Sequence, residues 1–233
     1  MHSSIVNIYA GFDPRVEVGF HTFCSSVIHH SSLPVRITPL GGQMLRAIWK
    51  DPHTDGTNEF TYLRWLIPWL QDWKGWALYV DGADMVCLDD IAELWALRDD
   101  YMAVQVVKHA YKTTATRKYI GTDLEAPNTD YPCKNWSSVM LMNCGSFAWR
   151  DLTPDTVAEM SGPELHRFGF MMPSKIGALP IEWNWMPQEF GPREDAGILH
   201  FTLGIPAFAH YRNCAQAGAW FEARDRMLCA SAT

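Results

Sequence analysis

The sequence is poor in basic residues and contains no cluster of them. Among its 233 residues, Lys and Arg together number 19 against 26 Asp and Glu, which gives a formal net charge of −7. Proteins that bind the phosphate backbone of a nucleic acid need clustered Lys and Arg, so no nucleic-acid partner is predicted. The basic residues between positions 108 and 134 are scattered through a polar stretch. We interpret that stretch first as a solvated loop and second as a contact for an anionic ligand.

Metal-binding cysteine motifs and long apolar runs are also missing. None of the six cysteines forms a Cys-x-x-Cys pair and no histidine cluster accompanies them, which argues against a zinc site. No apolar run reaches the ~18 residues that cross a bilayer, so no transmembrane segment is predicted. The first residues carry no basic segment followed by an apolar one, so no signal peptide is predicted either. Together these absences favour a reducing, cytoplasmic setting.

What the sequence does contain favours one α/β domain over residues 1–233, with a tail or helix over 212–233. Hydrophobic residues make up 48% of the chain, enough for a sizeable core. Apolar runs predict strands over 4–10, 35–40, 76–80, 102–107, 138–143 and 197–201. Helical spacing predicts helices over 18–30, 57–70, 91–97 and 153–160. This alternation is typical of a parallel sheet with crossover helices, and the polar stretch 110–136 is expected to be a long loop.

Two carboxylates follow a predicted strand that is almost wholly apolar. The run WALYV (76–80) leads directly into Asp81-Gly82-Ala83-Asp84. In open α/β sheets ligands bind beyond the carboxyl ends of the strands, and two like charges placed there need compensation. Mn²⁺ and Mg²⁺ take hard oxygen ligands together with substrate phosphates, so one of these ions is predicted as the cofactor. The alternative is a plain solvated turn, because Asp and Gly are common turn formers.

The segment that contains Asp81 and Asp84 continues into Asp90-Ile91-Ala92-Glu93-Leu94-Trp95. As a whole it resembles the aspartate motif of GT-A fold glycosyltransferases, most closely glycosyltransferase family 8 and its relatives. In that family a strand ends in Asp-x-Asp ahead of a short "Asp-Ile-x-Glu-Leu" helix. Asp84 aligns with the second aspartate and Gly82 with the first, so Asp81 needs a one-residue bulge to take the first role. The resemblance implies a single GT-A type α/β domain, with a Rossmann-like, mixed but mostly parallel sheet flanked by helices.

A histidine near the end of the chain supplies the third expected metal ligand. The segment from His200 to Pro206 (HFTLGIP) is similar to the family's "His-Phe-x-Gly-x-x-Lys-Pro" segment, whose His binds the metal. The resemblance therefore implies Asp81, Asp84 and His200 as the metal-binding set. Ile205 stands where the family carries a phosphate-contacting Lys. The donor diphosphate is therefore expected to depend more on the metal, on backbone amides or on another basic residue.

Other segments extend the resemblance to the donor site. Residues 58–64 resemble the family's helix whose Arg, here Arg64, lies near the donor, while 135–143 and 181–185 resemble a later strand and a "Trp/Tyr-Asn" element. The first strand leads to the place where such enzymes bind the base and ribose. The residues expected to bind the donor are Tyr9, Ala10, Phe12, Asp13, Arg64, Asp81 and Gly82.

The resemblance implies transfer of a sugar from a nucleotide-sugar, expected to be a UDP-sugar, to a carbohydrate or other hydroxyl acceptor, with retention of configuration. Glu182 is the candidate for contact with the transferred sugar, and Asp130 and His166 are further catalytic candidates. A nucleotidyltransferase is the competing enzyme, although its usual basic phosphate loop is represented near the first strand only by Arg15. The residues are also compatible with a glycosidase and with a degenerate, non-catalytic sugar- or nucleotide-binding module.

Overall fold

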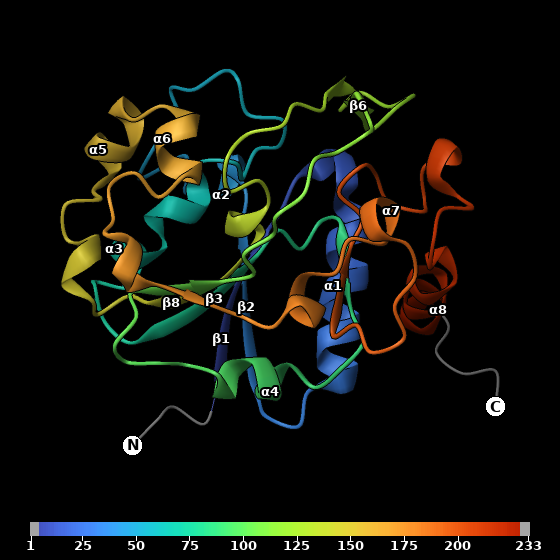
Figure 1. Ribbon diagram of the computed structural model, residues 1–233, viewed down its shortest axis with the longest axis horizontal. Coiled ribbons are helices and arrows are strands. Elements are labelled where there is room, and N and C mark those ends of the chain that lie inside the picture. The colour runs from blue at the N-terminus through green and yellow to red at the C-terminus, as the bar shows by residue number, and fades with distance from the viewer. Residues whose placement is uncertain (1–4, 229–233) are drawn as a thin grey trace.

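A six-stranded mixed sheet forms the centre of the computed structural model, which describes residues 5–228 (Figure 1). In spatial order its strands are β2 (Val35–Leu40), β1 (Val6–Gly11), β3 (Trp76–Val80), β8 (Val139–Asn143), β5 (Val104–Val106) and β9 (Ile176–Ala178). Strands β2, β1 and β3 are parallel, β8 is antiparallel to both neighbours, and β9 is parallel to β5. This arrangement confirms the expected mixed, mostly parallel sheet.

The central strands β1 and β3 are buried on both faces, which explains why their sequences are almost wholly apolar. Because side chains alternate along a strand, Tyr9 and Tyr79 pack into a core cluster on one face. Ile8, Leu78 and Val80 pack into a second cluster on the opposite face. The two clusters fix the register of β1 and β3 and so fix where these strands end. The residues that follow them are therefore held at one edge of the sheet.

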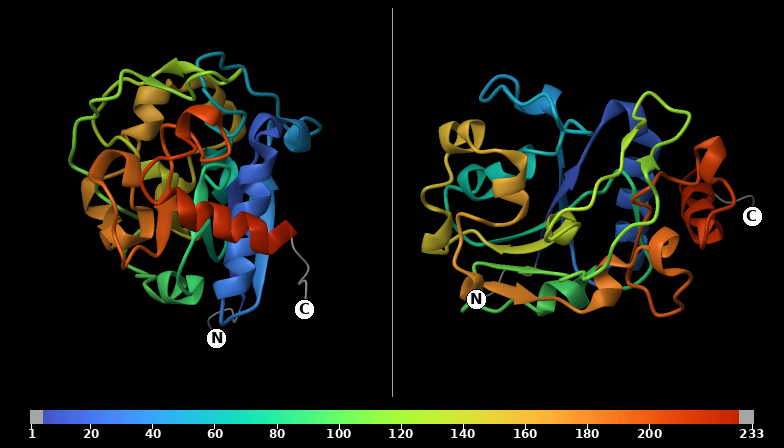
Figure 2. Two further views of the ribbon diagram at one scale, coloured as in Figure 1. Left: turned by 90° about the vertical axis from the view of Figure 1, so that its right-hand side faces the viewer. Right: turned by 45° about the horizontal axis from the view of Figure 1, so that its top comes forward.

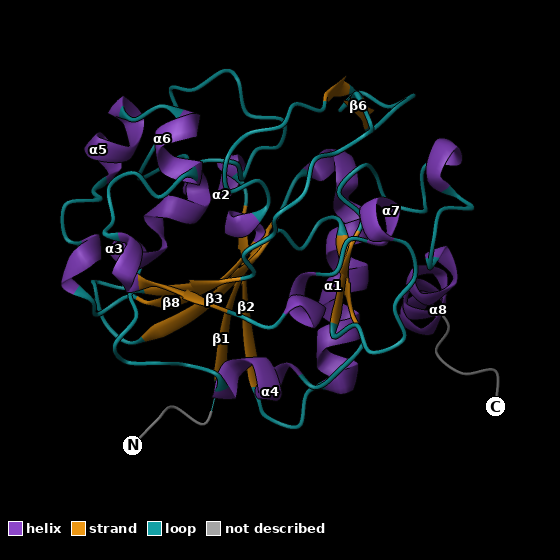
Figure 3. Cartoon of the chain, in the orientation of Figure 1, coloured by secondary structure: helices purple, strands orange, loops and turns teal. Residues whose placement is uncertain are grey.

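Helices cover both faces of the sheet, and Figure 3 shows the strands between two groups of them. One group packs Phe23 and Val27 of α1 (Glu17–His30) with Leu94 of α4 (Ile91–Ala96) against the sheet. Helix α8 (Ala217–Leu228) lies beside α1, red against blue in Figures 1 and 2. The opposite face is covered by α3 (Ile67–Leu70), α5 (Pro154–Glu159), α6 (Gly162–His166) and the 3₁₀ turn η2 (Leu63–Leu66).

A small second sheet carries the site described below. Strand β4 (Met85–Cys87) pairs antiparallel with β10 (Ile198–His200), so that Met85 lies opposite His200. The third sheet is a hairpin of β6 (Arg117–Lys118) and β7 (Ala126–Pro127). The remaining elements are α2 (Gly42–Leu45), α7 (Pro187–Phe190) and the 3₁₀ turns η1 (Pro14–Val16), η3 (Trp136–Ser138), η4 (Phe147–Trp149), η5 (Pro173–Lys175), η6 (Ile181–Asn184) and η7 (Ala209–Tyr211).

Some elements differ from the expectation. The helix predicted over 57–70 is wrong in its first half, where the chain forms turns before η2 and α3. Pro68 has no amide hydrogen to donate, so it suits the first turn of α3 and not the interior of a longer helix. The stretch 110–136, called the 110–136 loop below, contains the β6–β7 hairpin. The C-terminal segment expected as a tail or helix contains α8, and its last five residues lie outside the described range.

Between residues 5 and 228, none of the helices combines the length and apolar character needed to cross a lipid bilayer.

Candidate metal centre

Asp81, Asp84 and His200 come together at the tips of three strands. Asp81 follows β3, Asp84 precedes β4, and His200 ends β10, where the antiparallel register places it opposite the residue after Asp84. His200 Nε2 lies 3.4 Å from Asp84 Oδ1 and 3.8 Å from Asp81 Oδ2. Within the described chain, one ligand atom from each of the three lies within 4.8 Å of the others. The fold thus places the three residues predicted as metal ligands close enough to share one ion.

A tight turn at Gly82 brings the two aspartates to the same side. Gly82 has a φ of 62°, in the left-handed region that favours glycine. A Cβ atom there would lie 3.0 Å from the Ala10 Cβ and 3.2 Å from the carbonyl oxygen of Gly11, so a larger residue would also require these neighbours to shift slightly. The turn accommodates the two residues between Asp81 and Asp84. The turn therefore takes the place of the one-residue bulge that Asp81 needs in order to act as the first aspartate of the motif.

Each carboxylate is held by one of its two oxygen atoms. Asp81 Oδ1 accepts a hydrogen bond of 2.7 Å from the Tyr79 hydroxyl and lies 2.7 Å from Arg64 Nη1. Asp84 Oδ2 accepts a hydrogen bond of 2.9 Å from the Tyr119 hydroxyl. The second oxygen of each aspartate faces His200. The protein therefore orients both carboxylates from behind and leaves one oxygen of each for a shared ligand.

Asn184 fixes the orientation of the His200 ring. The Asn184 side-chain amide donates to Ser138 Oγ at 2.8 Å and to the backbone carbonyl of Asn135 at 3.1 Å. Its oxygen must then face His200 Nδ1, 2.9 Å away, and accept a hydrogen bond from it. In a neutral imidazole the proton sits on Nδ1, and the lone pair of Nε2 points at the two aspartates. This second layer of contacts is the kind that prepares a histidine to bind a metal.

The chemistry of these atoms fits a divalent cation. Asp84 Oδ1 is buried and has no hydrogen-bond partner among residues 5–228, although a buried charged oxygen without a partner is costly. Two carboxylate oxygens and an imidazole nitrogen form a donor set that Mn²⁺ accepts, and Mg²⁺ accepts the oxygens especially well. The site can therefore hold such an ion through Asp81 Oδ2, Asp84 Oδ1 and His200 Nε2.

Burial and neighbouring charges shift the aspartates in opposite directions. Burial raises the pKa of Asp81; the guanidinium of Arg64 offsets part of this rise, and the charge of Asp84 adds to it. Burial also pushes the pKa of Asp84 upward, but His200 and the hydrogen bond from Tyr119 outweigh it and hold the pKa below its usual range. Two acids at one site whose pKa values are shifted in opposite directions are typical of functional sites.

A pocket of about 450 Å³ opens in front of the three residues. This volume is within the range of small-molecule sites. Its walls come from the strand tips, from the 110–136 loop and from residues near 55–64 and 162–166. Of the residues singled out in the sequence, it is lined by Arg64, Asp81, Asp84, Asp130, His166 and His200.

Two of the three catalytic candidates line the pocket, and the third does not. Asp130 is exposed and accepts a hydrogen bond from the backbone amide of Thr113. His166 shares a hydrogen bond of 2.7 Å with Ser137 Oγ, and burial, together with the charges of Arg64 and Lys118, lowers its pKa to about 3. His166 is therefore a neutral group at ordinary pH.

Glu182, the candidate for contact with the transferred sugar, is not part of the pocket lining. Its carboxylate lies 3.8 Å from Arg193 Nη2 and is partly exposed. Glu182 is in η6, and so is Asn184, whose side chain reaches the centre through His200. The structure thus brings Asn184, and not Glu182, into contact with the ligand residue His200.

The residues expected at the donor base are likewise absent from the lining of this pocket. Tyr9 is buried in the core, where its hydroxyl is hydrogen-bonded to Gln71, and Ala10 is buried on the opposite face of the sheet. Phe12 is half-buried and packs edge-on against Phe20. Asp13 is fully buried.

The Asp13 carboxylate is already engaged within the protein. It accepts hydrogen bonds from the backbone and guanidinium of Arg15 and from the backbone amide of Glu59. Its pKa is lowered, because these hydrogen bonds outweigh the effect of burial. Asp13 thus ties the end of β1 to the segment before η2.

Sequence reasoning assigned no individual role to three side chains that shape the site: Lys118, Tyr119 and Asn184. Asn184 falls in the segment recognised as a "Trp/Tyr-Asn" element, so its position carried a signal. Lys118 is one of the scattered basic residues that were interpreted first as part of a solvated loop and second as a contact for an anionic ligand, and neither periodicity nor spacing marked Tyr119 beside it. Their importance follows only from the contacts that the folded loop makes with Asp84 and the pocket.

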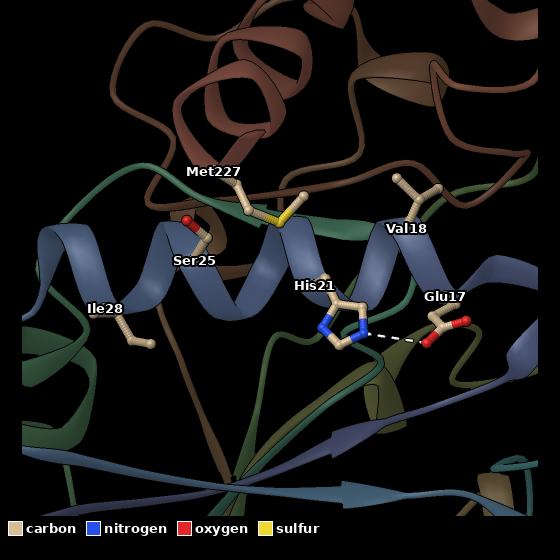
Figure 4. Close-up of a pocket in the computed structure, with 6 residues that line it drawn as sticks. All are labelled: Glu17, Val18, His21, Ser25, Ile28 and Met227. Atoms are coloured by element: carbon tan, nitrogen blue, oxygen red, sulfur yellow. Dashed lines mark hydrogen bonds and ion pairs between the residues drawn. The ribbon is translucent and has the colours of Figure 1, made fainter. Parts of the chain in front are cut away.

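A second hollow lies between α1 and α8, on the outer side of α1 (Figure 4). Two of its members, Glu17 and His21, are one helical turn apart on α1 with side chains 3.3 Å apart, and both side chains are more than half exposed. Its other members are Val18, Ser25, Ile28 and Met227. This hollow offers no convergent set of ligand atoms like the one at Asp84.

Comparison with known proteins gives a curated relative and several structural neighbours. Protein CDI of Arabidopsis thaliana is 36% identical over 221 residues, which cover 91% of this chain and 83% of that protein. No protein-family model matches the chain.

The structural neighbours share the fold at low sequence identity. The galactosyltransferase LgtC, solved with donor and acceptor sugar analogues, superposes with a TM-score of 0.57 at 13% identity, over 97% of this chain and 98% of LgtC. The bifunctional glycosyltransferase WbbM gives a TM-score of 0.66 at 14% identity, and the glycosyltransferase GlyE of Streptococcus pneumoniae gives 0.64 at 13%. This chain covers 96% and 97% of its own length in these two matches, but spans only 50% of WbbM and 62% of GlyE. These likenesses establish the GT-A type fold.

Proposed function

Since the chain belongs to the same family as Protein CDI of Arabidopsis thaliana and has a GT-A type fold, we propose that it is a metal-dependent glycosyltransferase. The donor would be a nucleotide-sugar, in the first place a UDP-sugar, and the acceptor a carbohydrate or another hydroxyl compound. The closer relationship to glycosyltransferase family 8, and with it retention of the anomeric configuration, is part of this proposal. It rests on the sequence motifs around Asp84 and His200.

The observation that carries the proposal is the set of three ligand atoms at the strand tips. Asp81 Oδ2, Asp84 Oδ1 and His200 Nε2 face one another, and the other polar atom of each side chain is held by the protein. They border a pocket of about 450 Å³ that could hold a sugar and a diphosphate. A solvated turn would need none of these supporting contacts.

Asp81, Asp84 and His200 would hold Mn²⁺ or Mg²⁺, and such an ion would supply positive charge that offsets the negative charge on the leaving nucleotide. Arg64 and Tyr79 would keep Asp81 in place, and Asn184 would keep the imidazole of His200 in its ligand orientation. Asp130 and neutral His166 stay candidates for contact with sugar or acceptor, because both line the pocket. Glu182 would need to separate from Arg193 to take such a role.

We propose the end of β1 as the place where the base and ribose bind. Phe12 is the half-buried aromatic residue there and is the better placed candidate for stacking, because Tyr9 is packed in the core. Asp13 would contribute by shaping this end of the strand, since its carboxylate is occupied by Arg15 and Glu59. Arg64, Asp81 and Gly82 complete the proposed donor site from the side of the metal centre.

Donor hydrolysis tests the proposal directly. The purified protein is incubated with Mn²⁺ and a panel of nucleotide-sugars, and the released nucleoside diphosphate is measured. We expect one donor to be cleaved, and cleavage to stop when EDTA removes the metal. Asp84→Asn should reduce the rate about 1,000-fold, since a metal ligand supplies several kcal/mol of transition-state stabilisation.

Asp123→Asn is the matched control, because Asp123 is an exposed aspartate outside the pocket. Its rate should equal that of the wild type. If no donor in the panel is cleaved and Asp84→Asn alters neither Mn²⁺ binding nor turnover, the proposed activity is wrong. Tight binding of UDP with Mn²⁺ but no turnover on any acceptor would instead identify a non-catalytic binding module.

We further propose that residues 1–233 act as a single domain in a reducing compartment. The strands of the large sheet all lie between the start of β1 and the end of β9. Strand β10 then adds His200 to the metal centre. The five cysteines within the described range are all unpaired, and thiols are kept in this state in a reducing compartment.

A further inference from the structure

Arg64, Lys118 and Lys134 line the pocket, and the charged groups of two of them make polar contacts within the protein. Arg64 pairs with Asp81 and donates to the backbone carbonyls of Thr61 and Ser137. Lys134 donates to Asn128 Oδ1 at 2.8 Å and to the backbone carbonyl of Thr129 at 2.7 Å. These contacts hold both side chains in place and leave only the Nη2 group of Arg64 and one N–H group of Lys134 for a ligand.

Lys118 is the third cation, and its ammonium group is different. It makes no hydrogen bond or ion pair with any other residue of the range 5–228; its nearest recorded partner is the ring of Tyr119, with Nζ 5.6 Å from the centroid. The side chain is partly buried, and burial lowers its pKa while the charge of Asp84 raises it. A partly buried ammonium group without a polar partner is unfavourable, and it suits a place where an anion binds.

Backbone contacts hold the chain around Lys118 in place, although its ammonium group makes no polar contact. Lys118 pairs with Ala126 in the β6–β7 hairpin. The next residue, Tyr119, donates its backbone amide to Leu203 at 2.6 Å and its hydroxyl to Asp84 at 2.9 Å. These contacts anchor the hairpin to the segment that follows His200 and to the metal centre itself. Lys118 is thereby held beside the three ligand residues with its charged end available.

The segment after His200 offers no cation of its own to the pocket. Ile205, at the position where a lysine was expected by resemblance, is fully buried and packs with Leu199 and Phe201 in an apolar cluster. From this segment His200 and Thr202 line the pocket. A diphosphate in front of the metal centre would therefore find its unpaired positive charge on the 110–136 loop.

We propose that Lys118 binds the diphosphate of the donor, replacing the basic residue that the C-terminal segment lacks. This inference rests on the proposed function and deepens it, because it names the protein group that recognises the leaving group of the donor. An ammonium group at this position donates charge-assisted hydrogen bonds to phosphate oxygens. It makes no contact with the base or the sugar of the donor. It adds to the affinity for a diphosphate without being a ligand of the metal.

The test is calorimetric titration of the full chain with UDP in the presence of Mn²⁺, and with Mn²⁺ alone. Lys118→Ala should weaken UDP binding about 10- to 100-fold, the usual effect of losing a hydrogen bond to a charged group. It should leave the affinity for Mn²⁺ alone unchanged or slightly increased, because a neighbouring positive charge has gone. Lys118→Arg, which keeps the charge, should lose less affinity for UDP than Lys118→Ala.

Lys112→Ala is the matched control, since Lys112 is an exposed lysine of the same loop that does not line the pocket. The melting temperature of Lys118→Ala should equal that of the wild type, because no hydrogen bond is removed. If Lys118→Ala binds UDP within twofold of the wild type, or loses Mn²⁺ and UDP affinity together, the role of Lys118 is refuted and the proposed function stands. If the wild type binds none of UDP, GDP and ADP with Mn²⁺, both proposals fail.

Discussion

Two of the walls of the pocket are built in different ways. One wall, the strand-tip wall, carries Asp81, Asp84 and His200, and each of these side chains has one polar atom held by a neighbour and one directed at the others. The other wall is the 110–136 loop, where polar groups such as Lys134 and Asn128 hold the loop to itself. Of the two lysines of that wall that line the pocket, Lys118 and Lys134, only Lys118 has an ammonium group that makes no polar contact within the described range.

This difference indicates that the two walls have separate functions. Ion binding needs ligand atoms fixed within a fraction of an ångström, and buried strands with supporting hydrogen bonds provide this. Substrate recognition tolerates more variation and is commonly carried by loops on a rigid scaffold. Substitutions on the strand-tip wall should therefore change metal affinity or global stability. Substitutions on the loop wall should change local order or affinity for the donor.

The largest effect is expected for Arg64→Ala, which breaks the buried ion pair on the strand-tip wall. The side chains of Arg64 and Asp81 are 6% and 14% exposed, so removing the guanidinium leaves a buried carboxylate without its partner. We expect the free energy of unfolding to fall by about 3 to 5 kcal/mol. Saturating Mn²⁺ should restore part of this loss, because the ion neutralises Asp81 from its other side.

Chemical denaturation with and without Mn²⁺ measures both effects. Arg46→Ala is a suitable control, since Arg46 is exposed and lies outside the pocket. A change of less than about 1 kcal/mol in Arg64→Ala would contradict the view that the strand-tip wall depends on compensated charges.

A smaller effect, on metal affinity, is expected at Asn184. Asn184→Ala removes the acceptor that fixes the proton on His200 Nδ1 and should weaken Mn²⁺ binding about 10- to 100-fold, as is usual for partners of metal-binding histidines. Asn184→Asp keeps an acceptor toward His200 and should lose less. Calorimetric titration with Mn²⁺ provides the measurement. Equal losses in the two variants would show that Asn184 acts only by packing.

The smallest effect is expected for Lys134→Met on the loop wall. Loss of the two hydrogen bonds to Asn128 and Thr129 should destabilise the 110–136 loop by about 1 to 2 kcal/mol. Amide hydrogen exchange should rise within this loop and not in the central sheet. Lys118→Met makes the same chemical change in the same loop and should leave exchange unaltered. Similar exchange in the two variants would remove the distinction between the two lysines.

The sequence predicted the central part of the fold because that part depends on local patterns. Strands β1, β3 and β8 are apolar runs whose burial on both faces follows from composition alone. Helix α1 follows from its apolar spacing. Strand β9 and the β6–β7 hairpin were not predicted, because their pairing depends on partners far along the chain or on polar residues such as Arg117 and Lys118.

The candidate site was predictable to the extent that motifs mark it. The motifs around Asp84 and His200 named three residues that the structure then places together. Which oxygen of each aspartate is engaged depends on Tyr79, Tyr119 and Arg64, and no spacing in the sequence reveals those contacts. Proposed roles for Tyr9 and Asp13 assumed accessible side chains, whereas packing and hydrogen bonding had already occupied them.

The pairing of β4 with β10 has a consequence for the order in which the molecule matures. The acidic pair comes from the first half of the chain, but the imidazole arrives only when residues near 200 dock against Met85. During synthesis the cation-binding set therefore stays incomplete until residues near 200 have left the ribosome. A nascent or clipped chain lacking β10 would keep the two acids without the histidine, so capture of the ion would report that β10 has paired with β4.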